Sequence, residues 1–369
     1  MSALADHIFE FIGAYITPRK YRFFTDGWGD VAVASRVASR AREVLSGDAT
    51  IGDVKLTWIT HDVVDDGYIR DSGYFTSPFA DALPPESARV SFTRFSPARR
   101  DVGTKRRVAV LLPCTGDQTE WYRAGIAREL LADGIECVVP TIAYYGDRKP
   151  PAQSAHVLRT VADAKIQLSV TPVEMMLLAR LVHADVVKNA KDASACDVDW
   201  VFAGISLGGT MSALAASALA ASRADVGGDV GVCCVAGPSD GTPFVDGSIG
   251  KRVAWDILAR ECGDDDDKAR ERMLYEMREL GVEGLVAANS VTKSVVLTAK
   301  HDRFVGVSSN EGIGRALRVM SGAGDAEAGD AYERYDFDGG HLNFLWKRKS
   351  VVAPAIKRAF GIDCDVIIA

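Results

Sequence analysis

The chain has 369 residues, of which 47% are hydrophobic and 25% charged, and its formal net charge is -7. This composition provides for a large buried core and argues against a globally disordered chain. A negative chain without a basic stripe disfavours nucleic acid as a partner. No stretch of the sequence reaches the roughly 18 consecutive apolar residues that a membrane-spanning helix needs.

The N-terminal residues are not typical of a secretory signal, because Asp6 and Glu10 interrupt an apolar stretch that lacks a basic start. Leu4, Ile8 and Ile12 recur at helical spacing and predict an amphipathic helix. We expect this helix to pack on the domain; the alternative is a helix on a membrane surface. The seven cysteines contain no CxxC pair, which favours reduced thiols over a zinc site or a disulfide framework. We therefore expect an intracellular, cytoplasmic protein, with an organellar or peripheral membrane location as the alternatives.

The predicted elements change in character along the chain. The first strands are short, rich in aromatic and β-branched residues, and joined without helices. From about residue 107, apolar runs alternate with segments of helical spacing. The predicted strands are residues 56–60, 67–76, 89–95, 107–112, 135–142, 198–204, 230–236, 294–299 and 332–337, and the predicted helices are residues 121–131, 173–190, 207–221 and 351–360. This order predicts a mostly parallel sheet with right-handed crossovers, helices on both faces and an antiparallel N-terminal edge.

Residues 250–290 interrupt the alternation with consecutive helical segments, which predict a cap inserted over the carboxyl edge of the sheet. We accordingly expect a core of residues 51–249 and 291–369, and a helical N-terminal extension of residues 1–50. Apolar side chains of the cap are expected to pack within it, and lining an acyl-chain pocket is the alternative. These side chains are Trp255, Ile257, Leu258, Met273, Leu274 and Met277. The acidic run at 264–267 is interpreted as a solvated loop, because it lacks the ligand spacing of a calcium-binding loop.

The strongest candidate for chemistry is the turn Gly204-Ile205-Ser206-Leu207-Gly208, which follows a predicted buried strand and opens directly into a helix. A serine in such a turn projects its hydroxyl from a backbone with strained angles. The chain doubles back so tightly that the residues two positions before and after must be very small, as Gly204 and Gly208 are. A plain glycine turn at the end of a strand is the alternative, since GxSxG also occurs by chance.

A serine nucleophile needs an acid and a histidine base, which follow it in that order in the α/β-hydrolase fold that the pattern predicts. Of the two histidines beyond Ser206, His341 follows the last predicted strand in a glycine-rich loop, where flexible glycines would carry the imidazole to the serine. His301 is expected to be a neighbour rather than the base. Asp302 comes directly after a strand and is the predicted acid; Asp240, one strand earlier, is the alternative.

Two backbone amides are expected to stabilise the charge that develops on the attacked carbonyl oxygen. One is the amide of Leu207, and the other is that of Thr115 in the loop after residues 107–112, with Gly116 as the next candidate. Gly116 is also predicted to contact substrate.

Residues 144–150 follow a predicted strand and should lie near the same edge of the sheet. Tyr144, Tyr145 and Arg148 are therefore candidates to contact a polar or anionic head group. A packed loop in which these side chains fill space is an equally weighted alternative.

Several stretches together resemble the α/β-hydrolase domain-containing protein 18 family. They are residues 23–29 (FFTDGWG), 73–78 (GYFTSP), 112–117 (LPCTGD), 144–150 (YYGDRKP), 339–341 (GGH) and the turn around Ser206. Cys114 departs from the glycine expected at its position. The resemblance implies a serine hydrolase of this fold that acts on acyl esters, including those of lipids.

The sequence thus predicts a serine hydrolase that cleaves a lipid or other carboxylic ester through Ser206, Asp302 and His341. The predicted reaction needs no metal and no organic cofactor. Two alternatives stay open: an acyltransferase that uses the same three residues, and an inactive member of the fold that serves as a binding or scaffold protein.

Overall fold

The computed structural model describes residues 6, 21–65, 67–98, 105–190, 197–222, 226–278, 281–323 and 330–368. The amphipathic helix predicted from Leu4, Ile8 and Ile12 lies outside the described residues.

Within the described chain, nine strands form a single sheet in the order β1-β2-β3-β5-β4-β6-β7-β8-β9. They are β1 (Thr57–Asp65), β2 (Tyr68–Thr76), β3 (Arg89–Pro97), β4 (Arg106–Leu112), β5 (Glu136–Pro140), β6 (Val198–Ile205), β7 (Gly227–Val235), β8 (Lys293–Ala299) and β9 (Tyr332–Phe337). The pairs β1–β2, β2–β3 and β3–β5 are antiparallel, and every pair from β5 through β4 to β9 is parallel. The predicted parallel sheet with an antiparallel N-terminal edge is confirmed.

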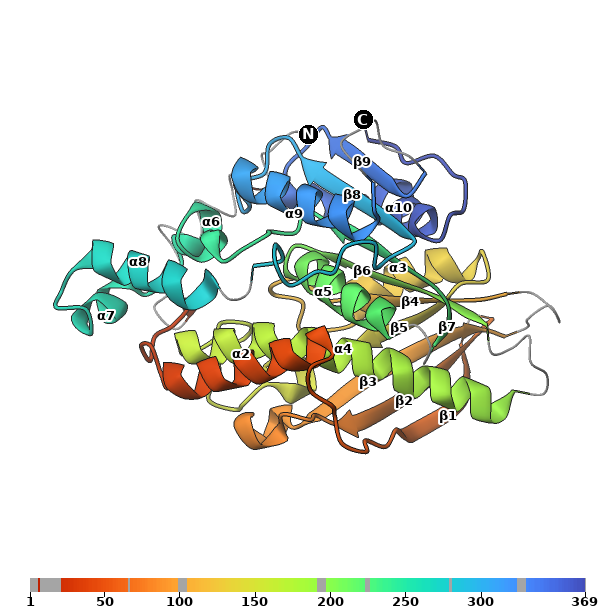
Figure 1. Cartoon of the computed structure of the whole chain (residues 1–369), viewed down its shortest axis with the longest axis horizontal. Helices are drawn as coiled ribbons and strands as arrows, with labels where there is room; N and C mark the ends of the chain where they lie inside the picture. The colour runs from red at the N-terminus through yellow and green to blue at the C-terminus, as the bar shows by residue number, and fades with distance from the viewer. Residues whose placement is uncertain are drawn as a thin grey trace.

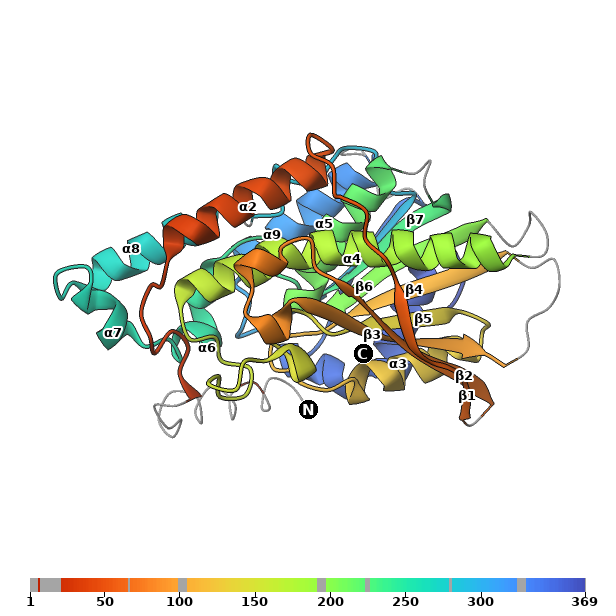
Figure 2. The same ribbon diagram turned by 90° about the horizontal axis from the view of Figure 1, so that it is seen from below.

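Helices cover both faces of the sheet (Figures 1 and 2). The helices on one face are α2 (Val31–Ser46), α4 (Val161–Asn189), α5 (Leu207–Ala221) and α9 (Val307–Met320), and those on the other are α3 (Trp121–Leu131) and α10 (Ala353–Ala359). Figure 2 shows α2 lying along α4 above the sheet, with α3 below it. The central strands therefore bury side chains on both faces, which explains their continuous apolar runs.

Helix α4 is longer than predicted, since it begins at Val161 and not at residue 173. Its start is a capping box: the Thr160 hydroxyl accepts a hydrogen bond from the Asp163 amide, and the Asp163 carboxylate accepts one from the Thr160 amide. Pro172 lies inside the helix, where a proline usually marks a boundary. Tertiary packing along the fully buried middle of α4 outweighs the loss of one backbone hydrogen bond.

Three helices lie between β7 and β8: α6 (Gly247–Gly250), α7 (Trp255–Arg260) and α8 (Asp266–Met277). Helices α7 and α8 lie side by side at one end of the molecule (Figure 1). Leu258, Met273 and Met277 are fully buried there, as expected for packing among helices. Asp265 does not lie in a loop alone but caps α8, because its carboxylate accepts hydrogen bonds from the amides of Asp267 and Lys268.

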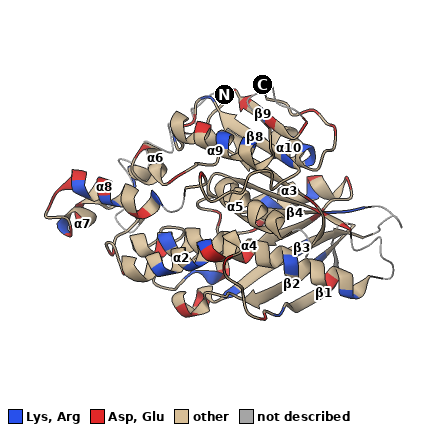
Figure 3. Cartoon of the chain, viewed as in Figure 1, with Lys and Arg blue, Asp and Glu red and all other residues tan. Residues whose placement is uncertain are grey.

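The described part of the chain contains neither a helix long and apolar enough to cross a membrane nor a cluster of side chains suited to a metal ion. In the ribbon of Figure 3, basic and acidic residues are interspersed along the helices.

Candidate active site

Ser206 occupies a sharp turn between β6 and α5. Its backbone has φ 55° and ψ -124°, and non-glycine residues rarely adopt a positive φ of this kind. The turn is held from both sides, because the Ser206 amide donates to the Val235 carbonyl over 2.8 Å and its carbonyl accepts from the Gly209 amide over 2.8 Å. The serine thus comes to the carboxyl edge of the sheet, at the N-terminus of α5.

The glycines on either side of Ser206 are required by close backbone contacts. A Cβ on Gly204 would lie 2.4 Å from the backbone of Gly208, and a Cβ on Gly208 would lie 2.7 Å from the carbonyl oxygen of Leu112. Both distances are shorter than any normal carbon contact. The small residues expected in this turn therefore bring β6, α5 and the loop after β4 together.

His341 and Asp302 form a buried hydrogen-bonded pair. His341 Nδ1 lies 2.8 Å from Asp302 Oδ2, and the two side chains are 6% and 2% exposed. The other oxygen of Asp302 accepts from the amides of Phe304 and Val305, over 2.8 and 2.9 Å, so the carboxylate has a fixed orientation. A carboxylate only accepts, so the proton is on Nδ1 and Nε2 is left as an acceptor.

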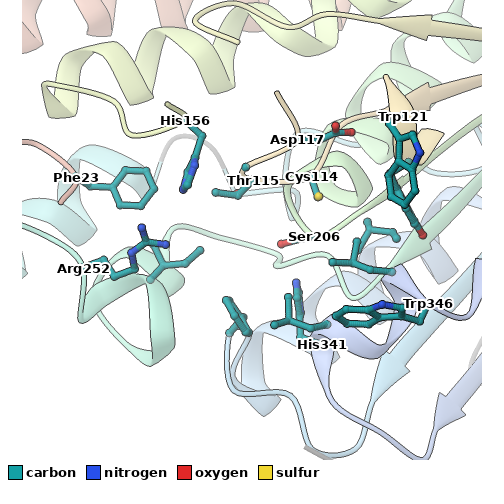
Figure 4. A pocket seen from close by; sticks show the side chains of 17 residues that line it. Phe23, Cys114, Thr115, Asp117, Trp121, His156, Ser206, Arg252, His341 and Trp346 are labelled. Carbon is teal, nitrogen blue, oxygen red and sulfur yellow. The ribbon is translucent and has the colours of Figure 1, made fainter. Parts of the chain in front are cut away.

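A ring that stacks on the imidazole of His341 also holds it in place, and the imidazole points toward Ser206. The ring of Phe304 stacks on it, with centroids 4.8 Å apart and an interplanar angle of 26°. Figure 4 shows His341 directed toward Ser206, with Thr115 on the opposite side of the serine. Three segments distant in sequence therefore converge at one edge of the sheet.

The alternative acid, Asp240, has other partners. Its carboxylate accepts hydrogen bonds from the Thr242 amide and hydroxyl, over 3.0 and 2.6 Å, and from the Ser309 hydroxyl over 3.1 Å. His301 is half exposed and lies 3.3 Å from Asp338, outside the pocket that contains Ser206. The geometry thus pairs His341 with Asp302 and leaves His301 as a neighbour.

The loop after β4 is anchored by an arginine that belongs to no recognisable sequence motif. Arg123, on α3, contacts Asp117 at 2.7 Å, and both side chains are almost fully buried. The Gly116 amide lies 3.4 Å from the Tyr145 hydroxyl, which engages it within the protein. Of the two amides considered in this loop, that of Thr115 is the better candidate for an oxyanion donor.

Cys114 lines the pocket beside these residues as a neutral thiol. Burial raises its pKa to about 12, and the charge of Asp117 acts in the same direction. Because the thiolate is the nucleophilic form of cysteine, this side chain adds a small apolar surface to the pocket near Ser206.

A cavity of about 440 Å³ leads to Ser206 and His341. One end is bounded by Trp121 and Trp346, which are 71% and 70% exposed and so form its mouth (Figure 4). The other end contains Phe23, His156 and Arg252 (Figure 4). Apolar residues such as Leu342 and Leu345 also line the cavity. Ser206 and Thr115 also line a second cavity of about 50 Å³.

The pocket contains residues that no local motif indicated. Burial, together with the charge of Arg252, lowers the pKa of His156 to about 4, so this imidazole is neutral around pH 7. Trp121 begins a helix and Trp346 follows the short helix at His341–Leu345, positions that carry no distinctive sequence pattern. The described lining of either cavity at Ser206 includes no residue of α7 or α8.

The three side chains predicted to contact a head group, Tyr144, Tyr145 and Arg148, are packed in the interior and do not line the cavity at Ser206. Arg148 is 1% exposed and forms a bidentate pair with Glu174, over 2.8 and 2.9 Å. Tyr144 and Tyr145 are each 2% exposed. The alternative of a packed loop therefore describes these side chains, and the expected head-group contact finds no support in the geometry. Gly116, by contrast, does line the cavity.

Together, the sheet order and the serine on its strained turn define the fold as that of the α/β-hydrolases. The chain belongs to the family described as alpha/beta hydrolase domain containing 18, which it matches over residues 21–268 and 260–362. A search of curated proteins finds no match.

Solved structures with the same fold include two esterases of low sequence identity. Acetyl xylan esterase 1 from Thermoanaerobacterium sp. JW/SL YS485 is 13% identical, with a TM-score of 0.50, over 90% of this chain and 98% of the esterase. An acetyl xylan esterase from Paenibacillus sp. R4 is 12% identical, with a TM-score of 0.51, over 89% of this chain and 97% of the esterase. At these identities the likeness establishes the fold alone.

Proposed function

We propose that the protein is a serine hydrolase that cleaves carboxylic esters, with Ser206 as nucleophile, His341 as general base and Asp302 as its acid partner. The observation that carries the proposal is the buried 2.8 Å contact between His341 and Asp302 beside the serine. A neutral imidazole with its proton on Nδ1 accepts the serine proton at Nε2, and the carboxylate stabilises the imidazolium that results.

In the proposed reaction, the Ser206 oxygen attacks the ester carbonyl carbon while its proton moves to His341. The amides of Leu207 and Thr115 donate to the oxygen that becomes negative, and the N-terminus of α5 favours the same charge. Collapse of the tetrahedral intermediate expels the alcohol, which takes the proton from His341. Water then attacks the acyl-enzyme by the same route, releasing the acid and restoring the serine.

The shape of the cavity supports an ester with a sizeable apolar group. A volume of about 440 Å³ lies within the range of pockets that enclose small ligands. Its aromatic mouth at Trp121 and Trp346 suits an acyl ester of a lipid or another apolar carboxylic ester. Arg252 lines it at the start of the proposed cap, residues 250–290, and Ile249, directly before the cap, lines it too.

Labelling with a fluorophosphonate tests the proposal directly. We expect the probe to modify wild-type protein at Ser206 and to leave Ser206→Ala unlabelled, with both proteins showing the same circular dichroism spectrum. His301→Ala is the matched control, because this histidine is half exposed and should retain labelling. Folded wild-type protein that takes up no probe would indicate an inactive binding protein and refute the hydrolase.

A series of p-nitrophenyl esters of increasing chain length, set beside a phospholipid panel, would then define the substrate. Product analysis with and without an added alcohol separates hydrolysis from acyl transfer. If the acyl group passes mainly to the added alcohol, the protein is an acyltransferase that uses the same residues.

A further inference from the structure

A buried carboxylate from the N-terminal part of the chain lies directly behind the loop that carries His341. Asp6 is completely buried. Its Oδ2 accepts a hydrogen bond from the backbone amide of His341 over 2.6 Å, and its Oδ1 accepts one from the amide of Leu342 over 2.9 Å. Asp6 and His341 are 335 positions apart in sequence, so only the tertiary fold brings them together.

These two amides need an acceptor from elsewhere. His341–Leu345 is a short 3-10 helix, and the first amides of a helix have no acceptor within it. Burial without a partner would cost the full desolvation of each amide. Asp6 satisfies two of them, and Asn343 satisfies a third by accepting from the Gly340 amide over 2.8 Å.

Gly340 explains how the carboxylate comes so close. Its φ of -94° and ψ of 173° are extended values that any residue adopts, so the conformation itself does not require glycine. A Cβ at this position, however, would lie 2.6 Å from Asp6 Oδ2. Because Gly340 has no side chain, the Asp6 carboxylate fits against its backbone. Close packing is therefore the reason for glycine at this position, and not the loop flexibility that the sequence suggested.

We propose that Asp6 is a positioning residue for His341. Asp6 fixes the backbone at His341 through its hydrogen bonds to the two amides, while Asp302 fixes the imidazole at Nδ1. Together the two carboxylates hold Nε2 toward Ser206. Asp6 does not line the cavity and acts through the histidine alone. This inference rests on the proposed hydrolase function, because it assigns His341 the role of base.

The first test is Asp6→Asn in the full-length chain. Asparagine keeps the shape of the side chain, but its NH2 group replaces one acceptor and opposes a backbone N–H. We expect kcat for a soluble ester to fall about 10- to 100-fold, the scale of a small misplacement of a catalytic group, while KM changes by less than about threefold. Asp30→Asn is the matched control, since Asp30 caps α2 through the Val33 amide over 2.9 Å and should leave kcat unchanged.

A second variant disturbs the same contact by changing Gly340 and leaving Asp6 unchanged. Gly340→Ala leaves Asp6 in place but pushes its carboxylate away from the two amides. We expect the same loss of kcat with little change in KM. This variant also serves if Asp6→Asn does not fold. A folded Asp6→Asn or Gly340→Ala protein with wild-type kcat would overturn the proposal.

A double-mutant cycle shows whether the effect passes through the histidine. In a His341→Ala background, adding Asp6→Asn should change the residual turnover by less than about twofold, because the base that Asp6 positions is gone. An equal loss in both backgrounds would mean a general structural role and would refute the proposal. If His341→Ala itself retains wild-type turnover, the proposed hydrolase function fails instead.

Discussion

Replacing Asp302 by asparagine exchanges one acceptor for a donor in a buried hydrogen bond and leaves the rest of the side chain almost unchanged. Oδ1 still accepts from the amides of Phe304 and Val305. The new NH2 group, however, faces His341 Nδ1 at the 2.8 Å separation now occupied by an acceptor. The imidazole must then present an unprotonated Nδ1, which puts its proton on Nε2, where it no longer accepts the serine proton.

The expected loss in kcat is about 10⁴-fold, the effect known for this change in other serine triads. At 1.36 kcal/mol per factor of ten, this equals about 5.4 kcal/mol in activation free energy. The free energy of unfolding should fall by only about 1.5–3 kcal/mol, the contribution of one hydrogen bond to a charged group. Stopped-flow hydrolysis of a p-nitrophenyl ester measures the first quantity, and urea denaturation measures the second.

Asp240→Asn is the matched control, because this carboxylate also accepts hydrogen bonds from a local amide, here with two hydroxyls, but its described hydrogen bonds do not include His341. We expect it to retain turnover within about tenfold of wild type, well short of the effect at Asp302. Should Asp240→Asn abolish turnover while Asp302→Asn preserves it, the assignment of the acid would be refuted.

Gly208→Ala places a Cβ 2.7 Å from a backbone carbonyl oxygen, so we expect it to lower both kcat and stability, the latter by about 1–3 kcal/mol in urea denaturation. Gly52→Ala, in open space, should change neither quantity, and equal behaviour of the two variants would contradict the steric argument. Arg148→Met leaves Glu174 as a buried unpaired charge and should cost about 3–5 kcal/mol of stability with KM unchanged; a selective rise in KM in a folded variant would instead indicate substrate contact. Burial lowers the pKa of His156 from 6.5 to about 4, so the unfolded chain binds a proton in this window that the folded chain does not, and stability falls as the pH drops from 6.5 to 4. The His156→Gln variant lacks this contribution, so its urea midpoint should fall less steeply than that of wild type between pH 6.5 and pH 4. Identical dependence of the two midpoints on pH would exclude the lowered pKa of His156.

The sequence by itself determined the fold because its signals are local. Residues 107–112 and 198–204 are apolar runs of strand length, and both became central parallel strands. The position of Ser206 followed from a strand, a glycine turn and a helix in immediate succession, a pattern contained within a few neighbouring residues. Strand order then indicated that Asp302 and His341 follow strands ending at the same edge of the sheet.

Contacts between distant segments were decided only by the tertiary structure. Arg148 looked available to a substrate because it follows a strand, yet packing pairs it with Glu174. Gly340 looked like a flexible position, yet its backbone is extended. Glycine is needed there because a Cβ would collide with the Asp6 carboxylate.

The cavity shows the same dependence on packing, since Trp121 and Trp346 both lie at its mouth although they come from segments far apart in the chain. The physical reason is that hydropathy and turn patterns act over a few residues, and they place a segment at an edge of the sheet. Which side chains touch there depends on separations of a few ångströms, and these are set by the packing of every layer of the protein at once.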